Sequence, residues 1–169
     1  MAERTNLVAA QYDSFADIYS LWTDTAASAA ANLSFYVEAY AATDGPIVEL
    51  GVGDGRIAIE AALRGCEVVG VDISEGMLGQ CRRRARAAGV SDKITLLQAD
   101  FRNFQLAHPA ALIALPYHSF GHLPTPRAKR QAVEHIFNQL RPGGRFLFDD
   151  FLITQHLVRR MRQVQLRAA

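Results

Sequence analysis

The sequence of 169 residues lacks several features that mark particular classes of protein. Its only cysteines, Cys66 and Cys81, form no CxxC pair and no cluster of the metal-binding type. No stretch approaches the roughly 20 consecutive apolar residues that span a bilayer. The N-terminus also lacks the basic-then-apolar order of a signal peptide. These absences predict a cytoplasmic protein with reduced thiols, no metal and no membrane segment.

The sequence also has little net charge. Lys and Arg total 18 and Asp and Glu total 17, so the formal net charge of +1 provides no chain-wide attraction for nucleic acid. The arginine runs at 82–86 and 159–162 lie beside apolar residues in predicted helices and have no interleaved aromatic residues. They are interpreted as solvated helix faces, and no nucleic-acid partner is expected. Half of the residues are hydrophobic, which is typical of a globular chain with its own core.

Apolar patterning divides the chain near residue 45. Residues 1–45 are predicted to form an N-terminal helical cover with helices at about 5–20 and 25–42. Residues 46–169 alternate strand and helix, with strands expected at 47–50, 67–72, 94–97, 110–115 and 145–149 and a last helix beyond them. Such alternation is typical of βαβ units. We therefore expect an α/β fold, a three-layer α/β/α sandwich with a mainly parallel sheet of five identifiable strands.

Three glycines, Gly51, Gly53 and Gly55, follow the first strand directly. Glycine allows a tight turn whose backbone touches a ligand, although a glycine-rich turn without a ligand is the alternative. The spacing is GxGxG, so the third glycine of a dinucleotide fingerprint would fall at Arg56. This disfavours a nicotinamide-dependent oxidoreductase. Asp54, within the loop, is expected to face solvent, with Arg56 close enough to offset its charge; the alternative is that it repels a carboxylate of the ligand.

Acidic residues follow the next two strands. Asp72 ends the second strand, where a carboxylate can accept hydrogen bonds from both hydroxyls of a ribose, although it could instead cap the turn before Ser74. Asp100 and Phe101 follow the third strand and suit the edge and the face of an adenine, although Asp100 alone suits a turn. Parallel strands bring these ends to one edge of the sheet, so the sequence predicts a nucleoside site there.

The stretches that carry these residues have a familiar combination and order. They are VELGVGDGRIAI, VVGVDISEGML, LLQADFRNF, ALPYHSFGHL and LRPGGRFLFDDF, preceded by YDSFADIYSLW. Together, from about residue 11 to 153, they resemble the class I S-adenosylmethionine-dependent methyltransferases of the Rossmann-like kind. The resemblance implies that the protein is a methyltransferase and that its cofactor is S-adenosylmethionine.

The resemblance also implies which residues surround that cofactor. In chain order they are Tyr12, Tyr19, Glu49, Gly51, Gly53, Gly55, Asp72, Ile73, Met77, Asp100, Phe101 and Leu115. Glu49 and the glycine loop would hold the methionine part, and Asp72 the ribose. The side chains at 73, 77, 100 and 101 would surround the adenine. The carbonyl at 115 would accept from the methionyl ammonium, and the two tyrosines would close over the cofactor.

The loop after the fourth strand should face the transferred methyl group and the acceptor. Tyr117, His118 and His122 are candidate substrate contacts, and His118 is the candidate base if the acceptor must lose a proton. Alternatively, either histidine only packs or bonds a loop carbonyl, since positioning alone can accelerate methyl transfer. Asp149 and Asp150 are expected to end the fifth strand beside this pocket. The loop lacks the Asn-Pro-Pro-Tyr run of nucleobase and amide methyltransferases, so a small-molecule amine or hydroxyl is the expected acceptor.

The family's sheet ordinarily ends in a further antiparallel strand pair, which the residues after about 153 do not match. We therefore expect either a truncated chain or a homo-oligomer that covers the edge of the fifth strand. The alternative to an active enzyme is a non-catalytic S-adenosylmethionine-binding protein or partner subunit.

Overall fold

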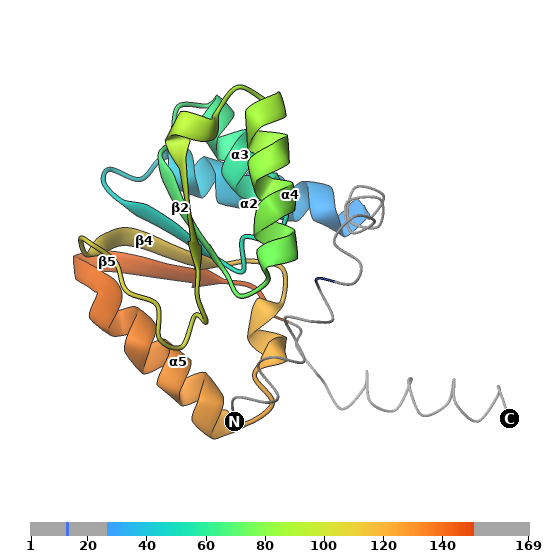
Figure 1. Ribbon diagram of the computed structural model, residues 1–169. Coiled ribbons are helices and arrows are strands. Elements are labelled where there is room, and N and C mark those ends of the chain that lie inside the picture. Colours follow the sequence, from blue (N-terminus) through green and yellow to red (C-terminus); the bar gives the residue numbers. More distant parts are fainter. Residues whose placement is uncertain (1–12, 14–26, 151–169) are drawn as a thin grey trace, which may run out of the picture.

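The computed structural model describes Asp13 and residues 27–150, and its centre is a sheet of five parallel strands. The strands are β1 (Ile47–Leu50), β2 (Val68–Asp72), β3 (Ile94–Gln98), β4 (Ala110–Leu115) and β5 (Leu140–Phe148). Their order across the sheet is β3-β2-β1-β4-β5 (Figure 1). The chain runs outward from β1 to β3 and then returns to the other side of β1 at β4. In such sheets the ligand site lies at this reversal, between the carboxyl ends of β1 and β4.

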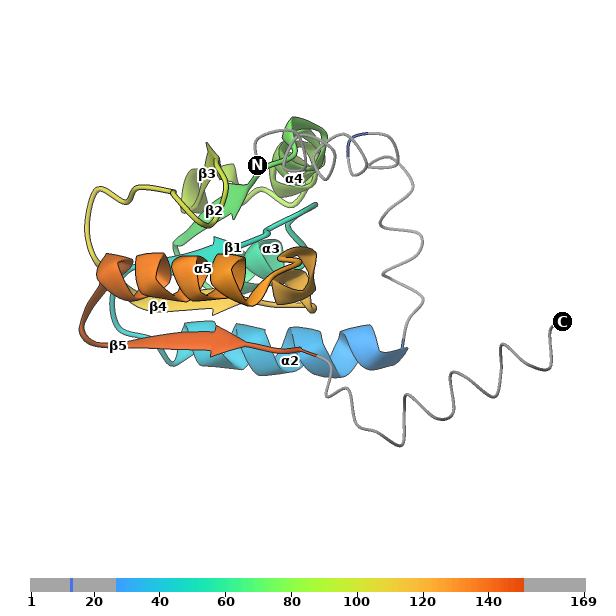
Figure 2. The same ribbon diagram turned by 90° about the horizontal axis from the view of Figure 1, so that it is seen from below.

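Helices cover both faces of the sheet. They are α2 (Ala27–Ala41), α3 (Arg56–Leu63), α4 (Glu75–Ala87) and α5 (Pro126–Gln139), with short 3₁₀ turns η1 (Ser91–Lys93) and η2 (Ser119–His122). One hydrophobic cluster joins α2, α3 and α4 to the sheet, and a second joins α5 and η2 to its other face. Figure 2 shows α5 on one side of the strands and α3 and α4 on the other. The expected α/β/α sandwich is confirmed.

Local sequence explains most element boundaries. All residues of β1 and β4 are buried, which is typical of parallel strands covered on both faces. Ser74 begins α4 by accepting a hydrogen bond from Met77 N, and Thr125 begins α5 in the same way with Pro126 next in the chain. Both β1 and β4 have the bounds that the apolar runs predict.

The last strand differs from its expected extent. The strand was expected to begin at residue 145, but β5 begins at Leu140 and includes Pro142, Gly143 and Gly144. Leu140 pairs with Ala110, and the register then shifts so that Arg145 pairs with Leu112. A bulge therefore absorbs the proline and glycines within the strand. In the described part of the chain β5 pairs with β4 alone and lies at the edge of the sheet.

The N-terminal helix expected at 5–20 and the helix expected after the last strand lie outside the described residues, apart from Asp13, which is helical. The helix expected at 25–42 is confirmed as α2. Among the described residues, no helix combines the length and the apolar character needed to cross a membrane.

Candidate functional site

The glycine loop after β1 is folded tightly against its neighbours. Gly51, Gly53 and Gly55 have φ values of 65°, 57° and 84°, a left-handed conformation that favours glycine. Gly55 N donates to Val52 O at 3.0 Å, and Val52 N donates to Val71 O of β2 at 3.1 Å. A Cβ on Gly51 would stand 3.1 Å from Ser119 Oγ, so this loop lies directly beside the loop after β4.

A hollow opens between these two loops. The β1–β4 pairing stops at Glu49 and Ala114, so Leu50 and Leu115 at the ends of the two strands lie beyond it. The hollow is lined by Glu49, Gly51, Val52, Gly53, Asp54, Arg56, Ile57, Pro116 and Tyr117. It therefore lies at the reversal of strand order, where ligands bind in sheets of this kind. Leu115, whose carbonyl is expected to accept a hydrogen bond from the ligand, is fully buried at this end of β4.

Glu49 is the buried acid of the hollow, with 2% of its surface exposed. Its Oε2 accepts a hydrogen bond from the Tyr40 hydroxyl of α2 at 3.1 Å. Burial raises the pKa of Glu49 from 4.5 to about 8, although the Tyr40 hydrogen bond and the charge of Arg56 oppose the rise. A cation bound in the hollow would favour the ionised carboxylate. The position is therefore suited to an ammonium group.

The burial of Asp54 contradicts one expectation. This residue was expected to face solvent, but it is 4% exposed and forms an ion pair with Arg84 of α4. Left-handed backbone at Gly53 and Gly55 folds the loop toward α4, and this places the carboxylate against that helix. Arg84 is thus more than part of a solvated face, whereas Arg82 at the surface pairs with Glu75 at 2.7 Å.

Asp72, at the end of β2, binds the backbone of the glycine loop. Its Oδ2 accepts from Gly53 N at 2.8 Å and its Oδ1 from Ser74 N at 2.9 Å. Burial raises the pKa of Asp72, and the N–H donors oppose this rise. The buried Met77 reaches the same loop, since a Cβ on Gly53 would stand 3.3 Å from its Cε. Asp72 therefore joins the β1 and β2 turns into one surface.

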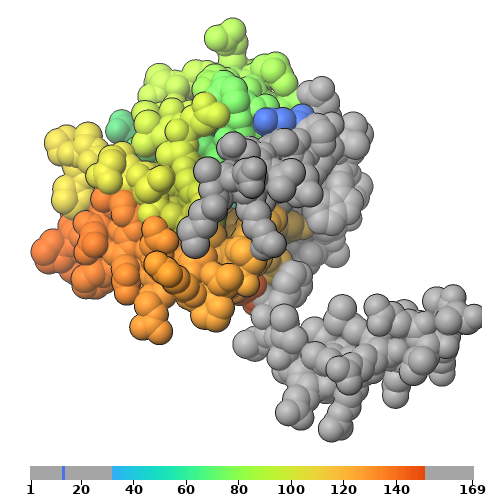
Figure 3. All heavy atoms as spheres, turned by 60° about the horizontal axis from the view of Figure 1, so that its bottom comes forward, coloured from blue at the N-terminus to red at the C-terminus, as the bar shows by residue number. Residues whose placement is uncertain are grey.

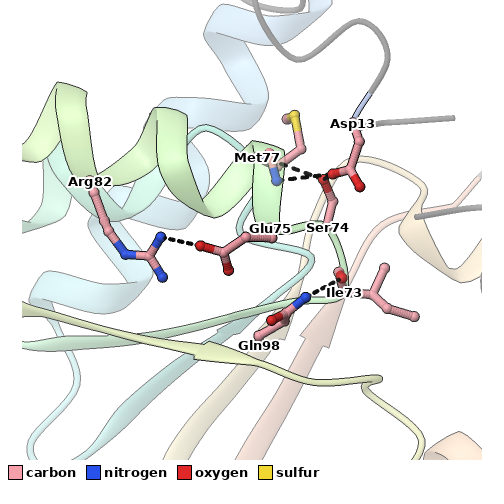
Figure 4. A network of polar contacts seen from close by, with 8 residues as sticks. Asp13, Ile73, Ser74, Glu75, Met77, Arg82 and Gln98 are labelled. Carbon is pink, nitrogen blue, oxygen red and sulfur yellow. Dashed lines mark hydrogen bonds and ion pairs between the residues drawn. The ribbon is translucent and has the colours of Figure 1, made fainter. Parts of the chain in front are cut away.

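The turn from β2 into α4 is also held by Asp13, which sequence reasoning did not single out. Asp13 Oδ1 accepts from Gly76 N at 2.9 Å and from the Ser74 hydroxyl. Figure 4 shows this contact at the start of α4, with the Gln98 amide of β3 donating to Ile73 O at 3.4 Å below it. Figure 3 shows α4 in green on the surface of the molecule. The place of Asp13 in the stretch YDSFADIYSLW was the available signal.

Asp100 has a partner that the sequence did not indicate. Arg102 Nε donates to both carboxylate oxygens at 2.9 Å, Arg102 N donates to Oδ1 at 2.9 Å, and Arg102 Nη2 donates to Oδ2. Burial opposes ionisation, but the hydrogen bonds from Arg102 outweigh it and lower the pKa of Asp100. The half-buried Phe101 packs against the second hydrophobic cluster.

The loop after β4 has an unusual backbone. Tyr117 and His118 have φ values of 60° and 59°, a left-handed conformation that costs non-glycine residues about 1–3 kcal/mol each. The Tyr117 ring lies 5.5 Å from Arg56 Cζ, which places both side chains at the hollow. His122, at the end of η2, is exposed and close enough to Asp72 for an electrostatic interaction.

Asp149, directly after β5, contacts this loop. Its Oδ1 accepts from Tyr117 N at 2.8 Å, and its Oδ2 lies 3.5 Å from His118 Nδ1. Asp149 thus follows the last strand, as expected, and contacts Tyr117, which lines the hollow. Of the sequence-predicted site residues, those of the β1, β2 and β4 ends are brought together. Tyr12 and Tyr19 lie outside the described residues.

Comparison with known proteins identifies the family. Residues 47–144 match the family model described as "Methyltransferase domain". The chain belongs to this family, the class I S-adenosylmethionine-dependent methyltransferases, whose cofactor is S-adenosylmethionine.

Two curated relatives illustrate the range of that family. The chain is 32% identical over 117 residues to the "Putative methyltransferase YqeM" of Bacillus subtilis, covering 68% of this chain and 45% of the relative. It is 30% identical over 112 residues to a "Carboxy-S-adenosyl-L-methionine synthase" of Nautilia profundicola, covering 65% and 46%. The chain thus spans about half the length of the curated relatives it matches.

Solved structures give the same fold. The CcbJ methyltransferase of Streptomyces caelestis superposes with a TM-score of 0.69 at 28% identity, covering 79% of this chain and 54% of that one. The glycopeptide N-methyltransferase MtfA, complexed with S-adenosyl-L-homocysteine, superposes with a TM-score of 0.62 at 29% identity, covering 69% and 47%. The names of the relatives describe different reactions, so membership of the family does not specify the reaction of this chain.

Proposed function

We propose that this chain binds S-adenosylmethionine in the hollow between the glycine loop and the loop after β4, and transfers its methyl group to a small-molecule amine or hydroxyl. The observation that supports the site best is that the buried Glu49 and Arg56 both line the hollow. An α-amino acid has an ammonium and a carboxylate. Arg56 is complementary to the carboxylate, and Glu49 is complementary to the ammonium once binding ionises it. The lining therefore fits the methionine part of the cofactor.

The nucleoside part fits the neighbouring strand ends. Asp72 accepts hydrogen bonds from loop N–H groups and, with about four lone-pair positions, retains capacity for a ribose hydroxyl. The partly exposed Ile73 and Phe101 are proposed to contact an adenine, with the buried Met77 behind them. Asp100 is proposed to accept a hydrogen bond from the adenine amino group. This requires Arg102 to break some of its hydrogen bonds to that carboxylate.

When bound, S-adenosylmethionine supplies an electrophilic methyl carbon on a positively charged sulfur. The protein's own residues then have to orient the acceptor and exclude water, because in-line displacement depends mainly on proximity. Tyr117, His118 and His122 follow β4 at this end of the sheet and are proposed to contact the acceptor. Tyr12 and Tyr19 are proposed to close over the cofactor.

Two observations support a small-molecule acceptor. One structural relative, at 29% identity, is a glycopeptide N-methyltransferase by its title. The near-neutral chain charge supports a small molecule over a nucleic acid. A homo-oligomer that covers the β5 edge and a cytoplasmic location stay predictions. The second candidate is a binding protein without catalysis.

Calorimetry with S-adenosylmethionine and S-adenosylhomocysteine tests the cofactor. Wild type should bind both, and Asp72→Asn should bind about tenfold more weakly through loss of a charged acceptor, ~1.4 kcal/mol. Asp92→Asn, at an exposed position in η1, is the matched control and should bind like wild type. Absence of binding by wild type would defeat the proposal. Binding without methyl transfer to any amine or hydroxyl pool would support the second candidate.

A further inference from the structure

We propose that Asp149 is a positioning residue that holds the imidazole of His118 in the tautomer with its hydrogen on Nδ1, so that Nε2 can take a proton from the methyl acceptor. The inference rests on the proposed function and deepens it. It narrows the acceptor to a group that loses a proton as it is methylated, which is a hydroxyl or an amine.

The two carboxylate oxygens of Asp149 have different partners. Three donors converge on Oδ1: Tyr117 N at 2.8 Å, the Tyr36 hydroxyl at 2.8 Å and Asn32 Nδ2 at 3.1 Å. Burial and the Asp149 hydrogen bond raise the pKa of Tyr36, so its hydroxyl keeps its hydrogen and stays a donor. Oδ2 is left facing His118 Nδ1 at 3.5 Å. The carboxylate is therefore fixed by α2 and the β4 loop, with one oxygen directed at the ring.

The backbone of the loop is shaped for this arrangement. Tyr117 and His118 are consecutive non-glycine residues with positive φ, and such strain persists where surrounding bonds hold it. Tyr117 N is held by Asp149, Ser119 Oγ donates to Pro116 O at 2.8 Å, and Gly121 N donates to His118 O at 2.8 Å. A histidine that only packed would not need two strained residues. The strain instead turns the imidazole toward the end of β5.

The tautomer follows from the chemistry of the two groups. An ionised carboxylate accepts hydrogen bonds and cannot donate one, so a neutral ring facing Oδ2 through Nδ1 has its hydrogen there. Nε2 then has a lone pair. The Nδ1–Oδ2 distance of 3.5 Å is at the outer limit of a hydrogen bond, and a positive charge on the ring would strengthen the attraction.

The proposed step balances in charge and protons. The acceptor's lone pair forms the bond to the methyl carbon as the carbon–sulfur bond breaks and its electron pair stays on the sulfur, which becomes neutral. The acceptor's proton passes to His118 Nε2, and Asp149 stabilises the resulting imidazolium. Release of that proton to water restores the neutral ring. Asp149 touches neither reactant and acts through His118 alone.

Nitrogen NMR of the histidine rings tests the proposal at pH ~8, where an ordinary imidazole is neutral. The His118 signals are assigned by their loss in His118→Gln. Wild type should show hydrogen on Nδ1. In Asp149→Asn the three donors should keep the amide oxygen at the Oδ1 position, so the amide NH₂ would face Nδ1 and move the ring hydrogen to Nε2. Asp150→Asn, the same change one residue along, should leave the wild-type tautomer.

Activity gives a second measurement. Asp149→Asn should lower kcat by about 10²-fold, the usual range for loss of a general base, while cofactor affinity in calorimetry stays within about twofold. Hydrogen on Nε2 in wild type, or an unchanged tautomer in Asp149→Asn, would overturn the proposal. If Asp149→Asn does not fold, the wild-type spectrum alone decides. Failure of the proposed function would show separately, as wild type that does not bind the cofactor.

Discussion

Replacing Glu49 by Gln should make the protein more stable and its cofactor binding weaker. Glutamine has the same shape and keeps an acceptor for the Tyr40 hydroxyl, but it has no charge. The folded protein holds a proton on Glu49 up to about pH 8, whereas the unfolded chain releases it near 4.5. Between these values the folded state binds more protons, so the free energy of unfolding of wild type falls as pH rises.

The size of the effect follows from the same two values. A carboxyl whose pKa rises from 4.5 to about 8 on folding costs the folded state about 5 kcal/mol above both values, relative to below both. At pH 7 about 3 kcal/mol of that loss is already present. Glu49→Gln lacks this titration. It should therefore match wild type near pH ~4 and exceed it by up to about 5 kcal/mol near pH ~9.

Urea unfolding followed by circular dichroism at a series of pH values measures this difference. Glu134→Gln, at an exposed position on α5, is the matched control and should follow the wild-type curve. If Glu49→Gln is no more stable than wild type at high pH, the burial penalty assigned to Glu49 is wrong. Calorimetry then tests function: the variant should lose at least tenfold in S-adenosylmethionine affinity, since hydrogen bonds to charged groups contribute about 1.5–3 kcal/mol. Unchanged affinity would refute contact with the methionyl ammonium.

Two further predictions concern the glycine loop and are measured by urea unfolding. Gly55→Ala should lower the free energy of unfolding by about 2–4 kcal/mol, because a Cβ at this position overlaps Cys81 Sγ. Gly65 is also left-handed but has nothing within 4 Å of such a Cβ, so Gly65→Ala should lower it by only about 1 kcal/mol. Equal losses in the two variants would exclude the overlap. Arg84→Met should lower the free energy of unfolding by about 2 kcal/mol, because it removes the ion pair between Arg84 and the buried Asp54. Adding Asp54→Asn should recover most of that loss. If it recovers nothing, Arg84 stabilises the protein through packing.

The sequence predicted the strands well where apolar runs are bounded by glycine or proline. Ile47–Leu50 and Ala110–Leu115 have the expected bounds because a parallel strand covered on both faces must be apolar throughout. The start of β5 was wrong because Pro142–Gly144 has the composition of a turn. Only the register against β4 shows that the strand continues through it as a bulge.

The sequence predicted where the residues of the candidate site lie better than it predicted which residues they contact. Strand ends fix where Glu49 and Asp72 lie, so a single sequence indicates them. The partners of Asp54 and Asp100 depend on loop conformation: Arg84 is 30 residues from Asp54, while Arg102 is only two residues from Asp100 and folds back on it. Neither pair has a periodic signal. The role of Asp149 likewise arises from two left-handed residues in another loop, Tyr117 and His118.

The electrostatics of the glycine loop connect its stability to its proposed ligand. The carboxylates of Asp54 and Asp72 both raise the pKa of Glu49, after the larger effect of burial. Arg56 opposes this rise, and Arg84 forms an ion pair with Asp54. A ligand with an ammonium and a sulfonium brings two positive charges to this region. Binding should therefore ionise Glu49 and release a proton near neutral pH, which calorimetry in buffers of different ionisation enthalpy would detect, and Glu49→Gln should abolish that release.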